Sequence, residues 1–230
     1  MGIVNGMTRA ANALRYWELR QQSVANNLAN ADTNGFKAER TFAQLVGDAL
    51  TVAGSATDLK AGSLKGTGNP LDLAIGGKGF FVVQTPQGER LTRAGSFQLD
   101  ATGKLVDDHG NAVLGEKGPI VVDKGTLVVD PSGAIKVDGK EVGRLRVESV
   151  PEGAQLTHAG ATMFLPPAGT TSVPPSERGL KQGFLEESNV STVGSMVDMI
   201  DIQRAYTSVQ RTVTTLDDVR KTISNELGRV

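Results

Sequence analysis

The side chains that could perform acid–base or metal chemistry in this sequence are few and widely spaced. Its only histidines are His109 and His158, and it contains no cysteine. A serine hydrolase needs a base beside its nucleophile, and no Gly-x-Ser-x-Gly segment accompanies either histidine. Asp107 and Asp108 precede His109, but adjacent residues of one turn rarely converge on a single metal ion. We therefore predict that the chain is not an enzyme and uses no metal or cofactor; a hydrolase based on either histidine is kept as an alternative.

Two further stretches resemble ligand loops only in part. Gly76-Gly77-Lys78-Gly79 lacks the Gly-Lys-Ser/Thr ending of a phosphate-binding loop and leads into an apolar run typical of a strand rather than a helix. Asp130-Pro131-Ser132-Gly133 has no glutamate at the spacing that closes a calcium loop. Both patterns predict turns.

Composition excludes several classes of function. The chain has 24 basic and 25 acidic residues, so no excess of positive charge indicates a nucleic-acid partner. No apolar run reaches about 18 residues, so we expect no membrane insertion. The start of the sequence lacks the basic residues and apolar block of a secretory signal, and we expect no cleaved signal peptide. The 28 glycines and 4% aromatic residues indicate many turns around an aliphatic core.

Apolar residues that recur in steps of three and four predict a helix at each end of the chain, over residues 3–28 and 191–227. The second helix would be about 50 Å long, more than a domain of this size needs, and its narrow stripe must be buried. One interpretation is that each helix lies on a globular core. We favour a coiled coil in which the two ends pack together or with neighbouring chains. The predicted assembly interface consists of Ile3, Met7, Leu14, Trp17, Val24, Leu28, Ile202, Tyr206, Val209, Val213, Leu216, Val219, Ile223 and Leu227.

The segment after the first helix predicts a sharp turn. It is rich in asparagine, which bonds its own backbone and tolerates left-handed dihedral angles, and its glycine permits a positive φ. The phenylalanine that follows is placed to fold back onto an apolar surface. The predicted signature turn comprises Asn26, Asn27, Asn30, Gly35 and Phe36.

The middle of the chain predicts a central antiparallel β-rich domain, so the fold class is mainly β with helical ends. Turn signals recur every eight to twelve residues, and Asp138-Gly139 is a strong hairpin signal. Residues 41–50 could form a short helix, and residues 51–68 read as an extended or mobile connector. The expected parts are 1–36 (helix and signature turn), 37–70 (flexible connector), 71–166 (β-rich domain), 167–187 (loop and return segment) and 188–230 (C-terminal helix).

Motifs across nearly the whole chain resemble the axial proteins of the bacterial flagellum, the rod and hook family. NNLANADTNGFK at residues 26–37 is similar to the signature that follows the family's first helix. GKGFFVV at 77–83 and LTRAGSF at 91–97 are similar to a second pair of motifs. GFLEESNV at 183–190 and MVDMI at 196–200 resemble the closing motif. All occur in the family's order.

The resemblance implies a structural subunit of the flagellar basal-body rod that polymerises through its terminal helices and transmits torque from motor to hook. The short stretch between Phe36 and Phe80 is more similar to proximal than to distal rod proteins, whereas Phe80-Phe81 is more like the distal type, which stays the alternative. The implied partners are further copies, neighbouring rod and hook-side axial proteins and the flagellar export apparatus. The implied location is the basal body in the periplasmic space, reached without a cleaved signal.

A glycan-binding β module with helical appendages is an alternative from another class. Such a module needs an exposed aromatic platform, and outside the predicted helices the chain offers phenylalanine but neither tryptophan nor tyrosine. This composition disfavours the alternative.

Overall fold

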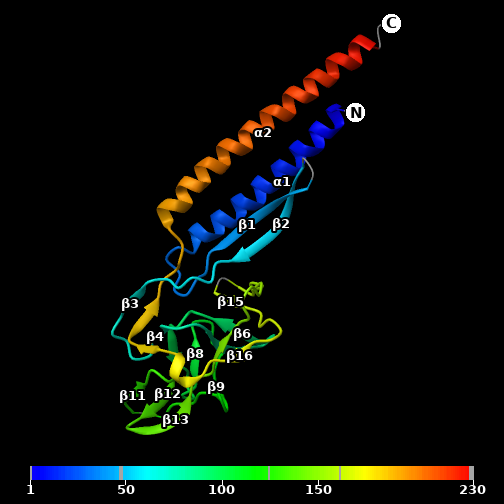
Figure 1. Ribbon diagram of the computed structural model, residues 1–230. Helices are drawn as coiled ribbons and strands as arrows, with labels where there is room; N and C mark the ends of the chain where they lie inside the picture. The colour runs from blue at the N-terminus through cyan, green and yellow to red at the C-terminus, as the bar shows by residue number, and fades with distance from the viewer. Residues whose placement is uncertain (1, 47–48, 124, 161, 228–230) are drawn as a thin grey trace. The chain divides into compact units, whose positions relative to one another are not determined.

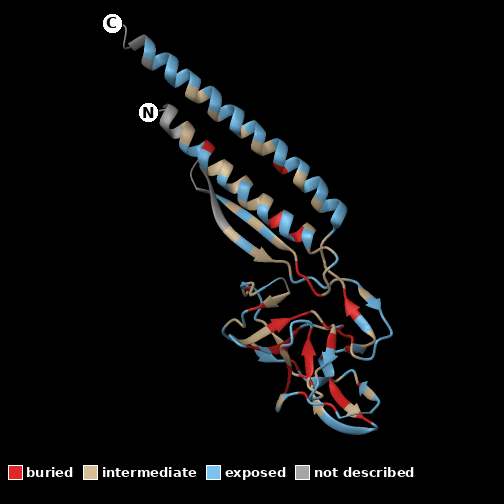
Figure 2. Ribbon diagram, turned by 180° about the vertical axis from the view of Figure 1, so that it is seen from behind, coloured by how far each residue is buried: buried red, intermediate tan, exposed pale blue. Residues whose placement is uncertain are grey.

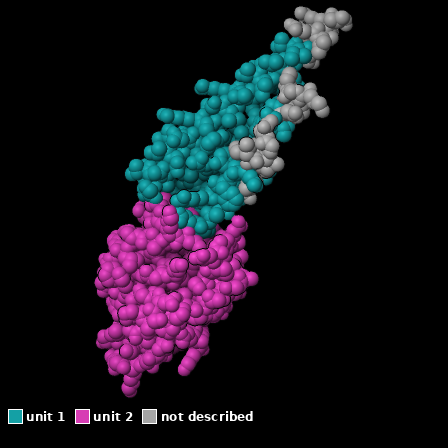
Figure 3. Space-filling model, viewed as in Figure 1, with its two compact units in different colours: residues 1–29, 39–58, 191–230 teal, residues 30–38, 59–190 magenta. Residues whose placement is uncertain are grey.

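A computed structural model describes the backbone of residues 2–46, 49–123, 125–160 and 162–227. Within these segments it does not describe the side chains of residues 2–5, 45–46, 49–53, 224 and 226–227. The chain folds into two compact units (Figure 3). Unit 1 comprises residues 1–29, 39–58 and 191–230, and unit 2 comprises residues 30–38 and 59–190.

Both predicted helices are present in unit 1 as α1 (Gly2–Ala29) and α2 (Thr192–Leu227). The amide of Gly194 donates to the Ser191 hydroxyl at 3.2 Å, so Ser191 caps the start of α2. The helices lie side by side and antiparallel (Figure 1). Near one end of the helix pair, a Cβ built on Gly6 of α1 would lie 3.6 Å from Leu216 Cδ1 of α2. Near the other end, Arg20 Nη2 of α1 lies 3.8 Å from Asp198 Oδ1 of α2.

A β-hairpin completes unit 1 and corrects the sequence interpretation of this region. Residues 39–46 and 49–57 form β1 (Glu39–Val46) and β2 (Ala49–Thr57), which pair antiparallel, so neither the short helix nor the flexible connector is correct for them; residues 47–48 lie outside the described residues. The hairpin packs on α1 (Figure 1). Asn27 fixes it, because its amide group donates to Glu39 O at 2.7 Å and its side-chain oxygen accepts from Glu39 N at 2.8 Å. Small and β-branched residues look like a linker by composition but suit a ribbon covered on one face.

Unit 2 is built from short strands joined by tight turns. They are β3 (Leu64–Gly66), β4 (Leu73–Ile75), β5 (Phe80–Thr85), β6 (Gly88–Thr92), β7 (Phe97–Leu99), β8 (Leu105–Asp107), β9 (Ala112–Gly115), β10 (Gly118–Pro119), β11 (Leu127–Val129), β12 (Ala134–Val137), β13 (Lys140–Arg144), β14 (Val147–Ser149), β15 (Met163–Phe164), β16 (Thr171–Ser172), the 3-10 helix η1 (Pro175–Glu177), β17 (Leu180–Gln182) and β18 (Phe184–Glu186).

Every strand pair in the described part of the chain is antiparallel, as predicted. The largest sheet runs in the order β15-β6-β5-β9-β8-β7, with β10 on β9, β14 on β5 and β16 on β14. Smaller sheets are β11-β12-β13, β17-β4 and β18-β3. Strands β13 and β14 are separated at Leu145, which leaves the ladder and whose amide bonds Gly133 O at 2.8 Å.

Strand β5 is the centre of the unit 2 core, because it contributes to both of its apolar clusters. Buried residues, drawn in red, gather in the strands of this unit (Figure 2). Successive side chains of a strand point to opposite faces, and both faces of β5 are covered. Phe81 and Val83 belong to the larger apolar cluster, which includes Leu73, Leu105, Val113, Ile135 and Leu145. Phe80 and Val82 belong to the second cluster, which includes Leu91, Leu156 and Phe164. The continuous apolar run at 80–83 is therefore a strand buried on both sides.

Aspartate-led turns connect several of these strands. The Asp138-Gly139 hairpin between β12 and β13 is confirmed, with φ values of 49° and 82°. In three other turns an aspartate carboxylate accepts from the amides two and four residues later. These turns are Asp100 with Thr102 and Lys104, Asp107 with His109 and Asn111, and Asp130 with Ser132 and Ala134.

Candidate assembly helices and a buried ionic cluster

The α2 residues of the predicted interface from Ile202 to Leu216 follow the buried side of that helix. Ile202 is fully buried, and the half-buried positions continue its stripe in steps of three and four. Val24 is the buried member on α1. The half-buried members are Met7, Leu14, Trp17, Leu28, Tyr206, Val209, Val213 and Leu216. Val219 and Ile223 are exposed, and Ile3 and Leu227 lie outside the described side chains.

A second apolar stripe at the start of α2 is exposed. Val193 is 73% exposed, and Met196, Val197 and Ile200 are each at least 50% exposed. Their spacing places them on one helical face. The predicted interface contains none of these residues, although apolar residues at 193, 196, 197 and 200 mark the stripe in the sequence.

Farther along α2, the exposed surface is a shallow groove of polar residues with internally bonded hydroxyls. The groove is lined by Ile200, Gln203, Arg204, Thr207, Ser208, Arg211, Thr212 and Thr215. Thr207, Thr212 and Thr215 each donate to the carbonyl four residues earlier, at 2.8, 3.1 and 3.0 Å. Because the helix itself satisfies these hydroxyls, a second helix could cover them without leaving a buried donor unpaired.

At the predicted signature turn the chain leaves α1 after Ala29, so Asn26 and Asn27 lie in the helix and the other three residues follow it. Gly35 has a φ of 72°, and a Cβ at this position would lie 2.2 Å from Ala94 N, so only glycine fits. Phe36 is fully buried, and the centre of its ring lies 6.5 Å from the centre of the His158 ring. Asn30 O accepts from Thr33 N at 3.1 Å. Of the other two asparagines, Asn27 holds the hairpin and Asn26 is exposed.

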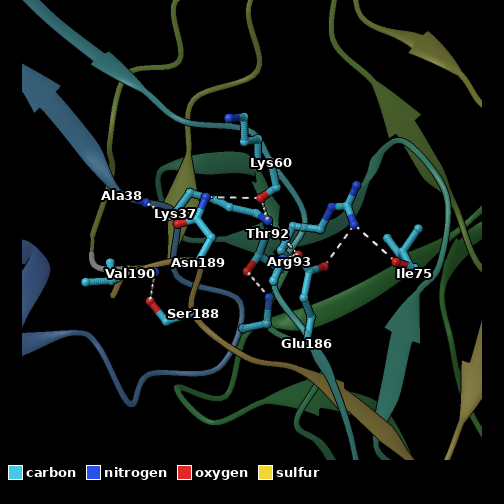
Figure 4. A network of polar contacts seen from close by, with 12 residues as sticks. Lys37, Ala38, Lys60, Ile75, Thr92, Arg93, Glu186, Ser188, Asn189 and Val190 are labelled. Carbon is cyan, nitrogen blue, oxygen red and sulfur yellow. Dashed lines mark hydrogen bonds and ion pairs between the residues drawn. The ribbon is translucent and has the colours of Figure 1, made fainter. Parts of the chain in front are cut away.

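The three charged groups of one buried cluster come from three of the sequence motifs (Figure 4). Lys37 Nζ lies 2.5 Å from Glu186 Oε1, and Arg93 Nη1 lies 2.9 Å from Glu186 Oε2. The side chains of Lys37, Arg93 and Glu186 are 1%, 6% and 0% exposed. We call these three residues the ionic cluster. Buried charges of this kind are tolerated only when paired and hydrogen-bonded.

The other polar contacts of the cluster are with the backbone, and among the described residues Arg93 Nε has no hydrogen-bond partner. Lys37 Nζ donates to Lys60 O at 2.6 Å, and the Gly62 amide donates to Glu186 Oε1 at 3.0 Å. Arg93 donates to Ile75 O at 3.2 Å and to Gly77 O at 2.9 Å. Its guanidinium also lies 5.3 Å from the centre of the Phe80 ring, a favourable position for a cation.

Electrostatics hold Glu186 in its charged form. Burial raises the pKa of its carboxyl group, but the charge of Arg93 and the hydrogen bond from Lys37 outweigh burial, so the pKa lies below its ordinary value. All three residues stand within sequence motifs, but the sequence does not predict that they meet. Glu186 is 149 residues from Lys37, and charged residues are ordinarily expected at the surface.

The histidines are placed in ways that favour structural roles. A cavity of about 690 Å³ in unit 2 is lined by residues that include His109, Asp108, Ser96, Arg90 and segment 32–34. The Ser96 hydroxyl bonds Asp108 at 3.3 Å, and Asp107 is engaged by the amides of its own turn. The ring centre of His158 lies 4.6 Å from that of Phe164. Among the described residues, no group of three or more acidic or histidine side chains could hold a metal ion.

The aromatic side chains of unit 2 do not build a glycan platform. Phe36, Phe80, Phe81, Phe97 and Phe164 are buried, whereas Phe184 is 38% exposed and lies beneath Lys181. A flat stacking surface for a sugar would need such rings at the surface.

No helix in the described part of the chain combines the length and hydrophobicity of a membrane span.

Comparisons with known proteins agree with the motifs. The model of the flagellar basal body rod FlgEFG protein C-terminal region matches residues 181–226, and that of the flagellar hook protein FlgE/F/G D1 domain matches residues 74–140. Flagellar basal-body rod protein FlgF of Mesorhizobium japonicum is 32% identical over 94% of this chain and 97% of the relative. FlgF of Caulobacter vibrioides is 33% identical, over 90% and 91% of the two chains. Flagellar basal-body rod protein FlgG of Bacillus subtilis is 30% identical, over 93% and 96%. The chain therefore belongs to the flagellar basal-body rod proteins of the FlgF/FlgG type.

Proposed function

We propose that this chain is a structural subunit of the flagellar basal-body rod and that it polymerises through its terminal helices. Family membership supports the first part, and the relatives carry the name of rod proteins. The exposed apolar stripe of α2 carries the second part. Four large apolar side chains on one face of a helix are costly in water and indicate a surface that another molecule covers.

The two faces of α2 have different roles in this proposal. The stripe centred on Ile202 packs toward α1 within one chain, in the manner of an antiparallel coiled coil. The opposite face, from Val193 to the threonine groove, meets other copies. A repeated contact between unlike surfaces yields an open helical assembly rather than a closed ring, which is the arrangement that a rod requires.

The remaining features of the proposal come from the family resemblance. The subunit would transmit torque from motor to hook, within the periplasmic space, and would contact neighbouring rod and hook-side axial proteins. It would reach this place through the flagellar export apparatus without loss of a signal peptide. We propose the FlgF-type, proximal position, supported by identities of 32% and 33% to FlgF relatives against 30% to the FlgG of Bacillus subtilis. A FlgG-type, distal position is the alternative.

Complementation of a strain that lacks this protein tests the proposal. The variant Val197→Asp/Ile200→Asp places two charges on the exposed stripe, and we expect its absence from isolated basal bodies and a loss of swimming. The matched control Val128→Asp/Val142→Asp charges two similarly exposed valines, 48% and 41%, on the small sheet of unit 2. We expect the control to be incorporated. Normal rods built from the stripe variant would refute assembly through this face.

Locating a tagged copy within the rod of the complemented strain separates the two rod positions. A tagged copy of the chain should be found in the part of the rod nearer the motor if the subunit is of the proximal type. Its presence along the part nearer the hook would favour the distal alternative. Both outcomes leave the structural role unchanged.

A further inference from the structure

The chain passes repeatedly between its two units, after residues 29, 38, 58 and 190. Within unit 2, the segments next to these passages are 30–38, 59–62 and 186–190. We propose that the ionic cluster is a mechanical clamp that fastens these three segments to one another and to the core of unit 2. A pull on any one segment is then resisted by all of them together.

The contacts of segment 186–190 carry the first step. Gly35 N donates to the backbone oxygen of Glu186 at 2.7 Å, and Asn189 N donates to Phe36 O at 3.4 Å. The Asn189 side-chain oxygen accepts from Ala38 N at 2.7 Å. Segment 186–190 is therefore joined to segment 30–38 along its length and not at a single point (Figure 4).

Segment 59–62 is joined to both of the others. Lys60 O accepts from Lys37 Nζ at 2.6 Å and from the Asn189 side-chain amide at 3.0 Å. Gly62 N donates to the Glu186 carboxylate at 3.0 Å. Each of the three segments thus has a direct bond to each of the other two, and the carboxylate of Glu186 bonds groups from two of them.

Arg93 connects this assembly of segments to the body of unit 2. It follows β6 directly, and besides Glu186 it bonds the carbonyl of Ile75 at the end of β4 and the carbonyl of Gly77 before β5. Glu186 itself ends β18, whose Leu185 is buried. A force applied to the segments is therefore passed to strands that form the core.

Burial makes the clamp cooperative. At a surface, water replaces each broken bond, so contacts are lost one by one. Here the carboxylate and both cations are almost inaccessible, and the loss of one partner leaves an uncompensated charge in a poorly polarisable interior. Peeling a single segment is therefore opposed by the whole cluster. Polymerisation through helices does not itself require such a cluster, so the clamp is independent of the proposed assembly.

Hydrogen exchange on the full chain tests the clamp. The variant Lys37→Met removes one cation and keeps the pair of Arg93 with Glu186. We expect exchange at the amides of Gly35, Ala38, Gly62 and Asn189 to rise together by roughly tenfold or more, because the segments open as one unit. The core amides of Leu73, Leu105 and Val122, which bond backbone oxygens, should change by less than about twofold.

The control is Glu89→Gln, which breaks the half-exposed pair of Arg146 with Glu89 in the same unit and should leave all these amides unchanged. Three results with Lys37→Met would overturn the proposal. One is faster exchange at residues 35–38 alone, since the segments would then be independent. Another is an equal rise at the core amides or unfolding of unit 2, since the cluster would then provide general stability. The third is no change.

Discussion

The two units of this protein differ in how much of their surface they bury. In unit 1 the buried side chains among the described residues are Ala10, Ser23, Val24, Asn27 and Ile202. Unit 2 contains two apolar clusters and, in addition, fully enclosed charges. A unit with so few buried side chains leaves apolar faces in water. A unit that encloses its own charges and apolar clusters has already formed its core and needs no partner to complete it. We infer that unit 2 is complete in the free chain and that unit 1 is completed by assembly.

Removal of the charge of Glu186 should reduce the difference between the two units most strongly. Glu186→Gln leaves Lys37 and Arg93 buried without a counter-charge, and we expect a loss of about 3–5 kcal/mol in the free energy that opens segments 30–38, 59–62 and 186–190. Glu89→Gln should cost less than about 1 kcal/mol, because its pair with Arg146 is half-exposed. Hydrogen exchange at the amides of Gly35, Ala38, Gly62 and Asn189 measures both. Equal effects would mean that the buried cluster contributes no more than a surface pair.

A backbone substitution tests the close packing of the signature turn. Gly35→Ala combines a left-handed φ with a Cβ that would overlap Ala94 N, and we expect a loss of about 2–3 kcal/mol in unit 2. Gly68→Ala is the matched control, because its φ is 74° but its Cβ would meet nothing within 4 Å. That change should cost about 1 kcal/mol. Similar losses at both positions would indicate that φ alone matters at Gly35.

Truncation of the fully buried side chain of α2 probes unit 1 by itself. We expect Ile202→Ala to destabilise unit 1 by about 2 kcal/mol, at the low end for a buried isoleucine because its surroundings are half-exposed. Trp17, Tyr16 and Tyr206 all lie in unit 1, so fluorescence reports its unfolding. Val193→Ala, at a 73% exposed position, should change stability by less than about 0.5 kcal/mol. Loss of unit 2 protection with Ile202→Ala would contradict the independence of the units.

Acid should weaken unit 2 through Glu186. The pKa of this carboxyl group is lower in the folded chain than in the unfolded one, so its contribution is complete above the unfolded value of about 4.3. The contribution is lost as the pH falls through the lower folded value, at roughly 1.4 kcal/mol for each pH unit between them. Hydrogen bonds from Thr102 and Ser132 lower the pKa of Asp100 and Asp130 in the same direction. Glu186→Gln should reduce the acid slope, and an unchanged slope would exclude Glu186 as its source.

The sequence predicts those parts of the fold that depend on local pattern. Both helices, the Asp138-Gly139 hairpin and the turn at Gly35 follow from periodicity and backbone preference, and all three are confirmed. The β1–β2 hairpin was missed because its small residues are also typical of a linker. Only the presence of α1 on one face, with Asn27 bonded to Glu39, makes this ribbon stable.

The candidate sites could be predicted only in part, for a different reason. The Ile202 stripe is visible in the sequence, but which stripe faces the same chain and which faces solvent depends on tertiary packing. The ionic cluster joins residues that are far apart in sequence, and no periodic pattern connects them. The one available signal was that Lys37, Arg93 and Glu186 each stand within a family-like motif.

Thiol labelling tests most directly whether the exposed stripe of α2 is covered on assembly. The chain has no cysteine, so a single Val197→Cys substitution provides a unique reporter, with Val128→Cys in unit 2 as the control. Both positions should react with a maleimide in the free chain. In isolated rods we expect the thiol at position 197 to be protected and the thiol at position 128 to remain reactive. Equal reactivity at position 197 in the free chain and in rods would contradict assembly through this face.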